Sequence, residues 1–470
     1  MRPKLPARYL LSAIVMIIPP IAMAGCAGCL SRFLIRPTIH YEVVQDSPDS
    51  EFATAQSVIT EAKTLVPPQA GDILVFGGAT GFSKPSGTAE FFDPNTKKFN
   101  GTGSMIQTRV GPIGTELATP LGKVLVAGGL TGSISVKKAV LTIKAQPTDI
   151  ELYDPATGTF SSSGNLVTPR TGYTQTTLAN GKILIAGGST AGGLPTSAAE
   201  IFDPSTSASS ATGNMLVPRM LHSATLLPDG TVLIAGGVID TAGVAVQTAE
   251  LYNPSTGKFT PVTGHLPVAM AGHTATLIEG CGCSVDGKVL LVGGFNGGGV
   301  ASVQSANAVA VVYDPSTGKF TSTAGQPIDD RAFQSATLLS NGTVLIAGGL
   351  YGQSNVGNGI AFGIYGGVRA SAEIYDPSTD SFTCVGGQGT TNCKPSMANS
   401  RAGHTATLMT SGPLAGQVLL VGGVGAKTTT SRGKGAALKS AELYDPVGGK
   451  FSATGSMKSA RAGHGVVLLE

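Results

Sequence analysis

A short apolar run that ends in two glycines occurs seven times, and this repetition constrains the fold more than any other feature of the sequence. Such a run, apolar throughout and rich in β-branched residues, indicates a strand buried on both faces. Self-similarity at a fixed period is the signature of repeat architectures, in which each unit is one supersecondary element. The diglycines are residues 77–78, 128–129, 187–188, 236–237, 293–294, 348–349 and 422–423.

Two further markers accompany each diglycine. An aromatic residue followed by Asp-Pro or Asn-Pro, as at residues 153–155, specifies a tight turn. Before strand A, six of the seven copies carry an arginine, and four carry a histidine three residues after that position, as in Arg401 and His404. Each unit therefore predicts four strands, A to D. Strand A follows the histidine, B ends in the diglycine, C ends in the aromatic-Asp-Pro, and D carries a phenylalanine.

These coupled markers resemble the kelch repeat, and the resemblance covers residues 72–470. It implies an all-β, seven-bladed β-propeller with four antiparallel strands per blade. The chain departs from the kelch pattern on strand D, where Phe replaces the usual Trp, and the third unit has only Ser and Ala after Pro204.

The chain ends predict how the ring closes. No strand A precedes the first diglycine, whereas residues 461–470 form a strand A with no strand B after it. We expect the C-terminal strand to complete the first blade, which removes exposed strand edges.

The N-terminus resembles an export signal. Arg2, Lys4 and Arg8 precede an apolar run over residues 9–24, in which Pro19 disfavours a membrane-spanning helix. Small residues then lead to Cys26, which resembles a bacterial lipobox. We expect a signal peptide over 1–25, a tether over 26–66, the propeller over 67–470, and a lipid-anchored protein in the periplasm or at the cell surface. Cys29 as the lipidated residue, or an ordinary secretory signal, remains an alternative.

Comparison of the copies predicts an ion pair within each blade. A glutamate stands two residues before the strand C aromatic in every copy but one, which has Val311. The arginine before strand A is also missing once, at Met270 of that same unit. We therefore expect one structural Arg–Glu pair within each of the other six blades, with Arg461 assigned to Glu90. The arginines are Arg109, Arg170, Arg219, Arg331, Arg401 and Arg461, and the glutamates are Glu90, Glu151, Glu200, Glu250, Glu373 and Glu442.

The repeat position three residues after the arginine supplies candidate ligand contacts: Tyr173, His222, His273, Gln334, His404 and His464. Hydrogen bonding between neighbouring blades is the simpler interpretation of this position. A metal site would need three or four such groups converging on one point, so we expect none.

The variable B–C and D–A loops share one face and are where binding usually occurs on a rigid scaffold. They carry further candidate contacts, Lys137, Lys138, Lys427, Arg432 and Lys434, which predict a locally basic face. The net charge is only +3, which offers no match to nucleic acid. We expect a monomer that binds another protein or a cell-surface glycan.

The cysteines fit an oxidising compartment. Cys384 and Cys393 stand nine residues apart in a D–A loop and predict a disulfide. Cys281 and Cys283 flank one glycine, and whether they pair with each other stays open.

We expect a binding scaffold that is not an enzyme and needs no cofactor. The alternative is a carbohydrate-active or oxidase-like enzyme with a site along the propeller axis. Copper radical oxidases contain a kelch-type propeller, but their chemistry needs Tyr and His ligands beside a cross-linked cysteine, and no cysteine here lies on a repeat strand near such a set. No nucleophile elbow or P-loop is present in the sequence.

Overall fold

A computed structural model describes residues 67–470, apart from gaps at 81–83, 119–121, 132–134, 138–139, 143–146, 192, 241–242, 298–303, 355–366, 390 and 427–435. The expected signal peptide, Cys26, Cys29 and the tether lie outside the described residues.

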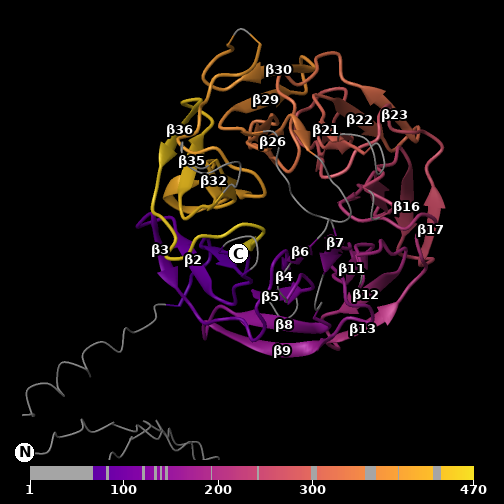
Figure 1. The fold of residues 1–470 in the computed structure, drawn as a ribbon, viewed down its shortest axis with the longest axis vertical. Coiled ribbons are helices and arrows are strands. Elements are labelled where there is room, and N and C mark those ends of the chain that lie inside the picture. Colours follow the sequence, from indigo (N-terminus) through magenta and orange to yellow (C-terminus); the bar gives the residue numbers. More distant parts are fainter. Residues whose placement is uncertain are drawn as a thin grey trace, which may run out of the picture. The chain divides into compact units, whose positions relative to one another are not determined.

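Seven four-stranded antiparallel sheets form a ring around one axis, which confirms the predicted seven-bladed β-propeller (Figure 1). The inner strands, position A of blades one to seven, are β37 (Gly465–Leu468), β4 (Ile113–Leu117), β10 (Thr174–Thr177), β14 (Ser223–Leu226), β18 (Thr274–Leu277), β24 (Ser335–Leu338) and β31 (Thr405–Leu408). Position B is β1 (Ile73–Phe76), β5 (Lys123–Ala127), β11 (Ile183–Ala186), β15 (Val232–Ala235), β19 (Val289–Val292), β25 (Val344–Ala347) and β32 (Val418–Val421).

The outer half of each blade follows the same order. Position C is β2 (Ala89–Asp93), β8 (Asp149–Asp154), β12 (Ala199–Asp203), β16 (Ala249–Asn253), β22 (Ala310–Asp314), β29 (Ala372–Asp376) and β35 (Ala441–Asp445). Position D is β3 (Lys98–Gly101), β9 (Thr159–Asn165), β13 (Ala208–Ala211), β17 (Lys258–Pro261), β23 (Lys319–Ser322), β30 (Ser381–Cys384) and β36 (Lys450–Ala453).

The C-terminal strand closes the ring as predicted. β37 pairs antiparallel with β1, with Val466 opposite Val75 and Leu468 opposite Ile73. β37 also lies beside the inner strands β4 and β31 of the two neighbouring blades. One blade is therefore built from both ends of the described chain.

The core lies between blades. Residues of strands B are almost fully buried, because each sheet is covered on both faces by its neighbours. One apolar cluster, for example, joins Leu233 of the fourth blade to Leu291 and Tyr313 of the fifth. The inner strands differ, since residues such as Thr274–Leu277 are all partly exposed, so solvent reaches them along the axis. Six blades also pack the strand C aromatic on the strand D phenylalanine, with ring centroids 4.7–5.2 Å apart.

The two ends of the propeller differ. In every blade the segment before strand A pairs with the residue that follows the diglycine, as in Met220 with Val238 and Ala402 with Val424. The B–C and D–A connections therefore share one end, which we name the loop end. The A–B and C–D turns lie at the opposite, turn end.

The connections carry small additional elements. The B–C loops contain β6 (Ser135–Lys137), β7 (Val140–Thr142), β20 (Phe295–Asn296), β21 (Gln304–Ala306), β26 (Leu350–Tyr351), β27 (Gln353–Ser354), β28 (Gly367–Val368), β33 (Val424–Gly425) and β34 (Ala436–Ala437). One 3-10 turn, η1 (Gly412–Leu414), lies in an A–B loop. Among the described residues, no helix has the length and apolar character needed to cross a membrane.

Candidate functional site

Six buried ion pairs fix the D–A connections at the loop end. Each arginine bonds the glutamate of its own blade at 2.5–3.1 Å, and both side chains are at most 3% exposed. The pairs are Arg109–Glu151, Arg170–Glu200, Arg219–Glu250, Arg331–Glu373, Arg401–Glu442 and Arg461–Glu90. Desolvation by burial lowers the pKa of Arg331, and the facing Glu373 opposes that shift.

Each pair also binds backbone. The arginine donates to the carbonyl of the first glycine of its diglycine, as Arg461 does to Gly77 at 2.8 Å. The glutamate accepts an N–H from the residue three before the arginine, as Glu90 does from Lys458 at 2.7 Å. A pair repeated in six blades, with its hydrogen bonds used on backbone, holds the D–A connection to its own blade.

The fifth blade replaces this arrangement by apolar packing. Met270 and Val311 are fully buried and belong to one apolar cluster. Pro267 stands where the other blades present the N–H that the glutamate accepts, and proline has no N–H. Three residues have therefore changed together, so neither charge of the pair is left buried without the other.

The histidine position lies between blades. The Nε2 atom of His222 bonds Thr174, and that of His464 bonds Thr405, each on the inner strand of the preceding blade. His273 and His404 bond Ser223 and Ser335 in the same way. Tyr173 donates to the carbonyl of Ala127, and Gln334 to that of Val292. The six candidate contacts are thus each used on a different blade boundary and do not converge.

Desolvation keeps these imidazoles neutral. It lowers the pKa of His222 and His464 to about 3 and that of His273 to about 4, and it lowers the pKa of His404 well below its usual value. The first diglycine residue makes room for the ring: a Cβ on Gly187 would lie 2.6 Å from Cε1 of His222. The histidine ring that precedes one blade therefore packs against the first diglycine residue of the neighbouring blade.

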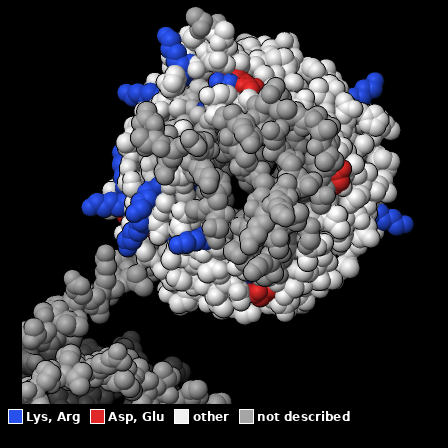
Figure 2. Space-filling model, in the orientation of Figure 1, with Lys and Arg blue, Asp and Glu red and all other residues white. Residues whose placement is uncertain are grey.

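The basic loop candidates are not brought together in the described part of the chain. Lys137 lies in β6, but its side chain is outside the described residues, as are Lys138, Lys427, Arg432 and Lys434. Figure 2 shows Lys and Arg at the rim, mostly on the side where β3 and β36 lie in Figure 1.

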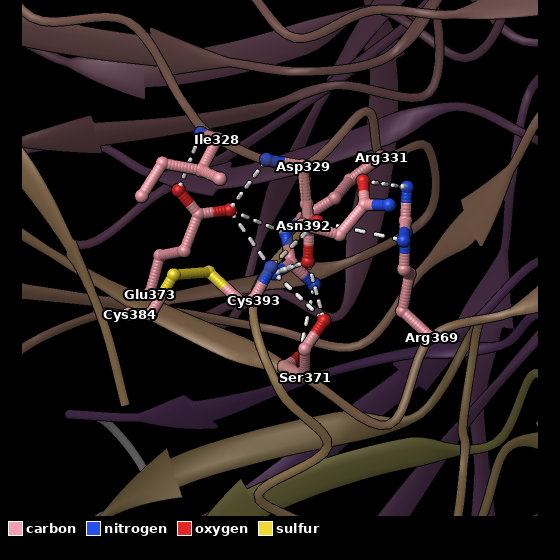
Figure 3. The surroundings of a disulfide bond; sticks show 9 residues. All are labelled: Ile328, Asp329, Arg331, Arg369, Ser371, Glu373, Cys384, Asn392 and Cys393. Carbon is pink, nitrogen blue, oxygen red and sulfur yellow. Dashed lines mark hydrogen bonds and ion pairs between the residues drawn. A yellow bond between two sulfur atoms is a disulfide. The ribbon is translucent and has the colours of Figure 1, made fainter. Parts of the chain in front are cut away.

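A disulfide anchors one D–A loop of the sixth blade (Figure 3). Cys384 and Cys393 are bonded, and the N–H of Cys393 donates to the buried carboxylate of Asp329 at 3.2 Å. The other Asp329 oxygen accepts from Ser371 and, at 2.8 Å, from Arg331. Every oxygen of this carboxylate is thus used to hold the loop. This group has no counterpart in the repeat, and the sequence analysis missed it.

A ring of left-handed residues surrounds the axis at the loop end; we call it the collar. Its members stand just before the histidine position: Gly111, Gly172, Leu221, Gly272, Phe333, Gly403 and Gly463. All seven have φ between 56° and 69°. Backbone bonds link neighbouring blades through it, for example from Gly272 N–H to Leu221 and from Phe333 N–H to Gly272. The signal for the collar in the sequence is the residue just before the histidine position, which is glycine in five units and a bulky residue in two.

No protein-family model matches this chain, and no curated protein matches it. Solved structures do. One match is a fungal alcohol oxidase of the AA5 family in complex with copper, with a TM-score of 0.55 and 18% sequence identity. The alignment covers 79% of this chain and 71% of the oxidase chain. At this identity the likeness shows the shared fold.

This neighbour corrects our expectation that the chain is not an enzyme. That expectation rested on the absence of recognisable catalytic motifs in the sequence, and the neighbour with the same architecture is an alcohol oxidase. The shared fold therefore fits an enzyme as well as a binding scaffold.

Among the described residues, no group of His, Cys, Asp and Glu side chains fits a copper ion. A copper site needs several free nitrogen, oxygen or sulfur donors around one point. Across the described ranges, the group that lies close enough to share an ion is Asp329, Glu373 and Cys393. Cys393 is bonded to Cys384, and Asp329 and Glu373 are occupied by Arg331 and by backbone donors.

Proposed function

We propose that this protein is an exported enzyme that acts on a small, uncharged, hydroxyl-bearing molecule, an alcohol or a carbohydrate, at the axial part of the loop end. The observation that carries the proposal is the pair Leu221 and Phe333, which keep a left-handed backbone where five other blades have glycine. The fold shared with an alcohol oxidase supports the reaction class.

Leu221 and Phe333 are costly choices at these positions. Both have φ of 56°, a conformation that costs a residue with a side chain about 1–2 kcal/mol and glycine almost nothing. Such strain gathers at functional sites, where a side chain is needed in spite of its cost. Since the other five members are glycine, the collar itself does not need these side chains.

The two side chains pack on one apolar cluster at the loop end, together with Met220, Ala271 and Phe295. The Phe333 ring lies 5.8 Å from that of Phe295, and a Cβ on Gly272 would touch both rings. Leu221 covers Gly172 in the same manner, since a Cβ there would lie 3.7 Å from its Cδ2. The inner strands below carry mainly Thr, Ser and Ala, as in β14, β18 and β24. Apolar side chains at the loop end, together with the hydroxyl groups of partly exposed inner strands, favour a neutral, hydroxyl-bearing ligand.

Export belongs to the same proposal. Two disulfides support an oxidising compartment. The N-terminal pattern supports a signal over 1–25, lipid attachment at Cys26 and a tether over 26–66 that precedes the kelch-like propeller.

The test uses the full-length protein and a panel of alcohols and mono- and oligosaccharides. Peroxide release and new reducing ends are measured, on metal-free protein and after incubation with copper. We expect turnover of at least one neutral substrate, and an about tenfold lower kcat/KM in Leu221→Gly and in Phe333→Gly, which is about 1.4 kcal/mol of transition-state binding.

Lys97→Gly is the matched control. Lys97 has φ of 55° in a C–D turn at the turn end, so the same replacement relieves the same strain away from the collar. Turnover that is equal in wild type, Leu221→Gly and Phe333→Gly would contradict the proposal, and so would a panel without any substrate.

A second candidate function is docking of a partner protein on the loop end. The residues three before the arginine in blades two to four are Ile106, Val167 and Leu216, and they are 57%, 54% and 59% exposed. Exposed apolar groups on successive blades favour a protein contact. Replacing the three by serine should remove partners captured by cross-linking on intact cells; an unchanged set of partners would contradict this candidate.

A further inference from the structure

We propose that the Cys281–Cys283 disulfide is redox-active and exchanges with thiols of other molecules at the turn end of the fifth blade. The two residues lie in the A–B loop between β18 and β19, and their sulfurs are bonded to each other across Gly282. This activity is independent of the site at the collar.

The bridge contributes little to holding the loop. A disulfide stabilises a fold mainly by closing a loop in the unfolded chain, and a separation of two residues closes almost none. Other contacts already fix the loop: the Asp286 carboxylate accepts N–H groups of Gly280 and Gly282 at 3.1 and 3.2 Å. The N–H of Gly287 bonds the carbonyl of Ile278 across the base.

The bridge is accessible to attack. Cys281 and Cys283 are both partly exposed, and Gly282 between them is exposed. The other disulfide differs, because Cys393 is 6% exposed and packs over Asp329. Exposed bridges are the ones that exchange readily, whereas buried structural bridges resist reduction.

The geometry indicates which sulfur leaves. The backbone N–H of Cys283 points at Sγ of Cys281 at 3.3 Å. When a thiolate attacks Sγ of Cys283, a mixed disulfide forms, the bond between the two loop sulfurs breaks, and Cys281 leaves as a thiolate that this N–H stabilises. A second thiolate then attacks the incoming sulfur of the mixed disulfide and Cys283 leaves.

The products of the two steps balance. The attacking thiols are joined in a new disulfide and have lost two electrons, and Cys281 and Cys283 hold those electrons and two protons as a dithiol. A low-molecular-weight disulfide, such as oxidised glutathione, restores the bridge and is itself reduced to two thiols. Asp286 places a carboxylate beside the bridge, so neutral or basic thiol peptides fit it better than acidic ones.

The first experiment uses the second disulfide as an internal reference. The full-length protein is equilibrated in glutathione buffers of graded composition, free thiols are alkylated, and each bridge is followed by mass spectrometry. We expect half-reduction of Cys281–Cys283 at a ratio of reduced to oxidised glutathione about tenfold or more below that needed for Cys384–Cys393. Equal ratios, or a higher one, would overturn the proposal.

The second experiment measures exchange. A neutral dithiol peptide is oxidised by oxidised glutathione in the presence of each protein. Wild type should accelerate the reaction, Cys281→Ser/Cys283→Ser should not, and Cys384→Ser/Cys393→Ser should behave like wild type. If Cys384→Ser/Cys393→Ser does not fold, Asp286→Asn serves as the second variant. It should oxidise an acidic dithiol peptide faster than wild type does, because the carboxylate beside the bridge is removed. Equal rates for wild type and Cys281→Ser/Cys283→Ser would overturn the proposal.

Discussion

Arg461 and Glu90 are bonded at 2.9 Å although 371 residues separate them along the chain. The arginine precedes the last strand of the chain and the glutamate lies on the third strand of the first blade. The same guanidinium bonds the carbonyls of Gly77 and Thr88, both at 2.8 Å. This pair therefore holds the C-terminal strand in the blade that the first described strand begins.

Removal of Arg461 alone should be severe. Arg461→Met leaves the Glu90 carboxylate buried without its partner, which costs about 3–5 kcal/mol. The variant Arg461→Met/Glu90→Val/Lys458→Pro copies the set Met270, Val311 and Pro267 of the fifth blade and should recover most of that loss. Urea unfolding, read as free energy, compares them; a triple variant no more stable than Arg461→Met would contradict this account.

The Arg–Glu pairs could be predicted because the one unit that lacks the arginine is also the one unit that lacks the glutamate. Met270 and Val311 lie in one unit, so the loss of one charge predicted the partner of the other. The fold followed from the same repetition.

The network around Asp329 could not be predicted, since Ser371, Cys393 and Arg331 come together only through the path of one D–A loop. The collar could not be predicted either, because a leucine in place of a glycine does not show whether the backbone keeps its left-handed conformation.

The neutral histidines predict loss of stability in acid. Their folded pKa values lie below the unfolded value of about 6.5, so the unfolded chain binds more protons as the pH falls. Stability should be complete above pH 6.5 and should fall between there and pH 4, by up to about 1.4 kcal/mol per pH unit for each histidine.

One substitution isolates a single histidine. His222→Gln copies Gln334, which holds the same position in the sixth blade, and should reduce the slope of the free energy of unfolding in this range. Asp72 acts in the opposite direction, because desolvation raises its pKa to about 6, and it is present in both proteins. Identical slopes for wild type and His222→Gln would show that the ring is not held neutral.

The proposed lipid attachment at Cys26 predicts a change of cell fraction. Cys26→Ala should leave the protein unprocessed by lipidation and move it from the membrane to the soluble fraction, measured by fractionation and blotting. Cys29→Ala is the matched control and should stay with the membrane. Membrane retention of Cys26→Ala with release of Cys29→Ala would assign the lipid to Cys29 instead.

The collar predicts an unusual order of stability. At an ordinary backbone position, glycine is less stable than alanine by about 0.5–1 kcal/mol. At position 333 the order should reverse, with Phe333→Gly more stable than Phe333→Ala by about 1 kcal/mol, since both lose the same ring contact with Phe295 and only alanine keeps the left-handed strain. Ala336 in β24 is the control, and Ala336→Gly should destabilise. Urea unfolding of the three variants measures the difference. If alanine were the more stable residue at 333, Phe333 would be held there without strain, and the reason for placing the substrate at the collar would be lost.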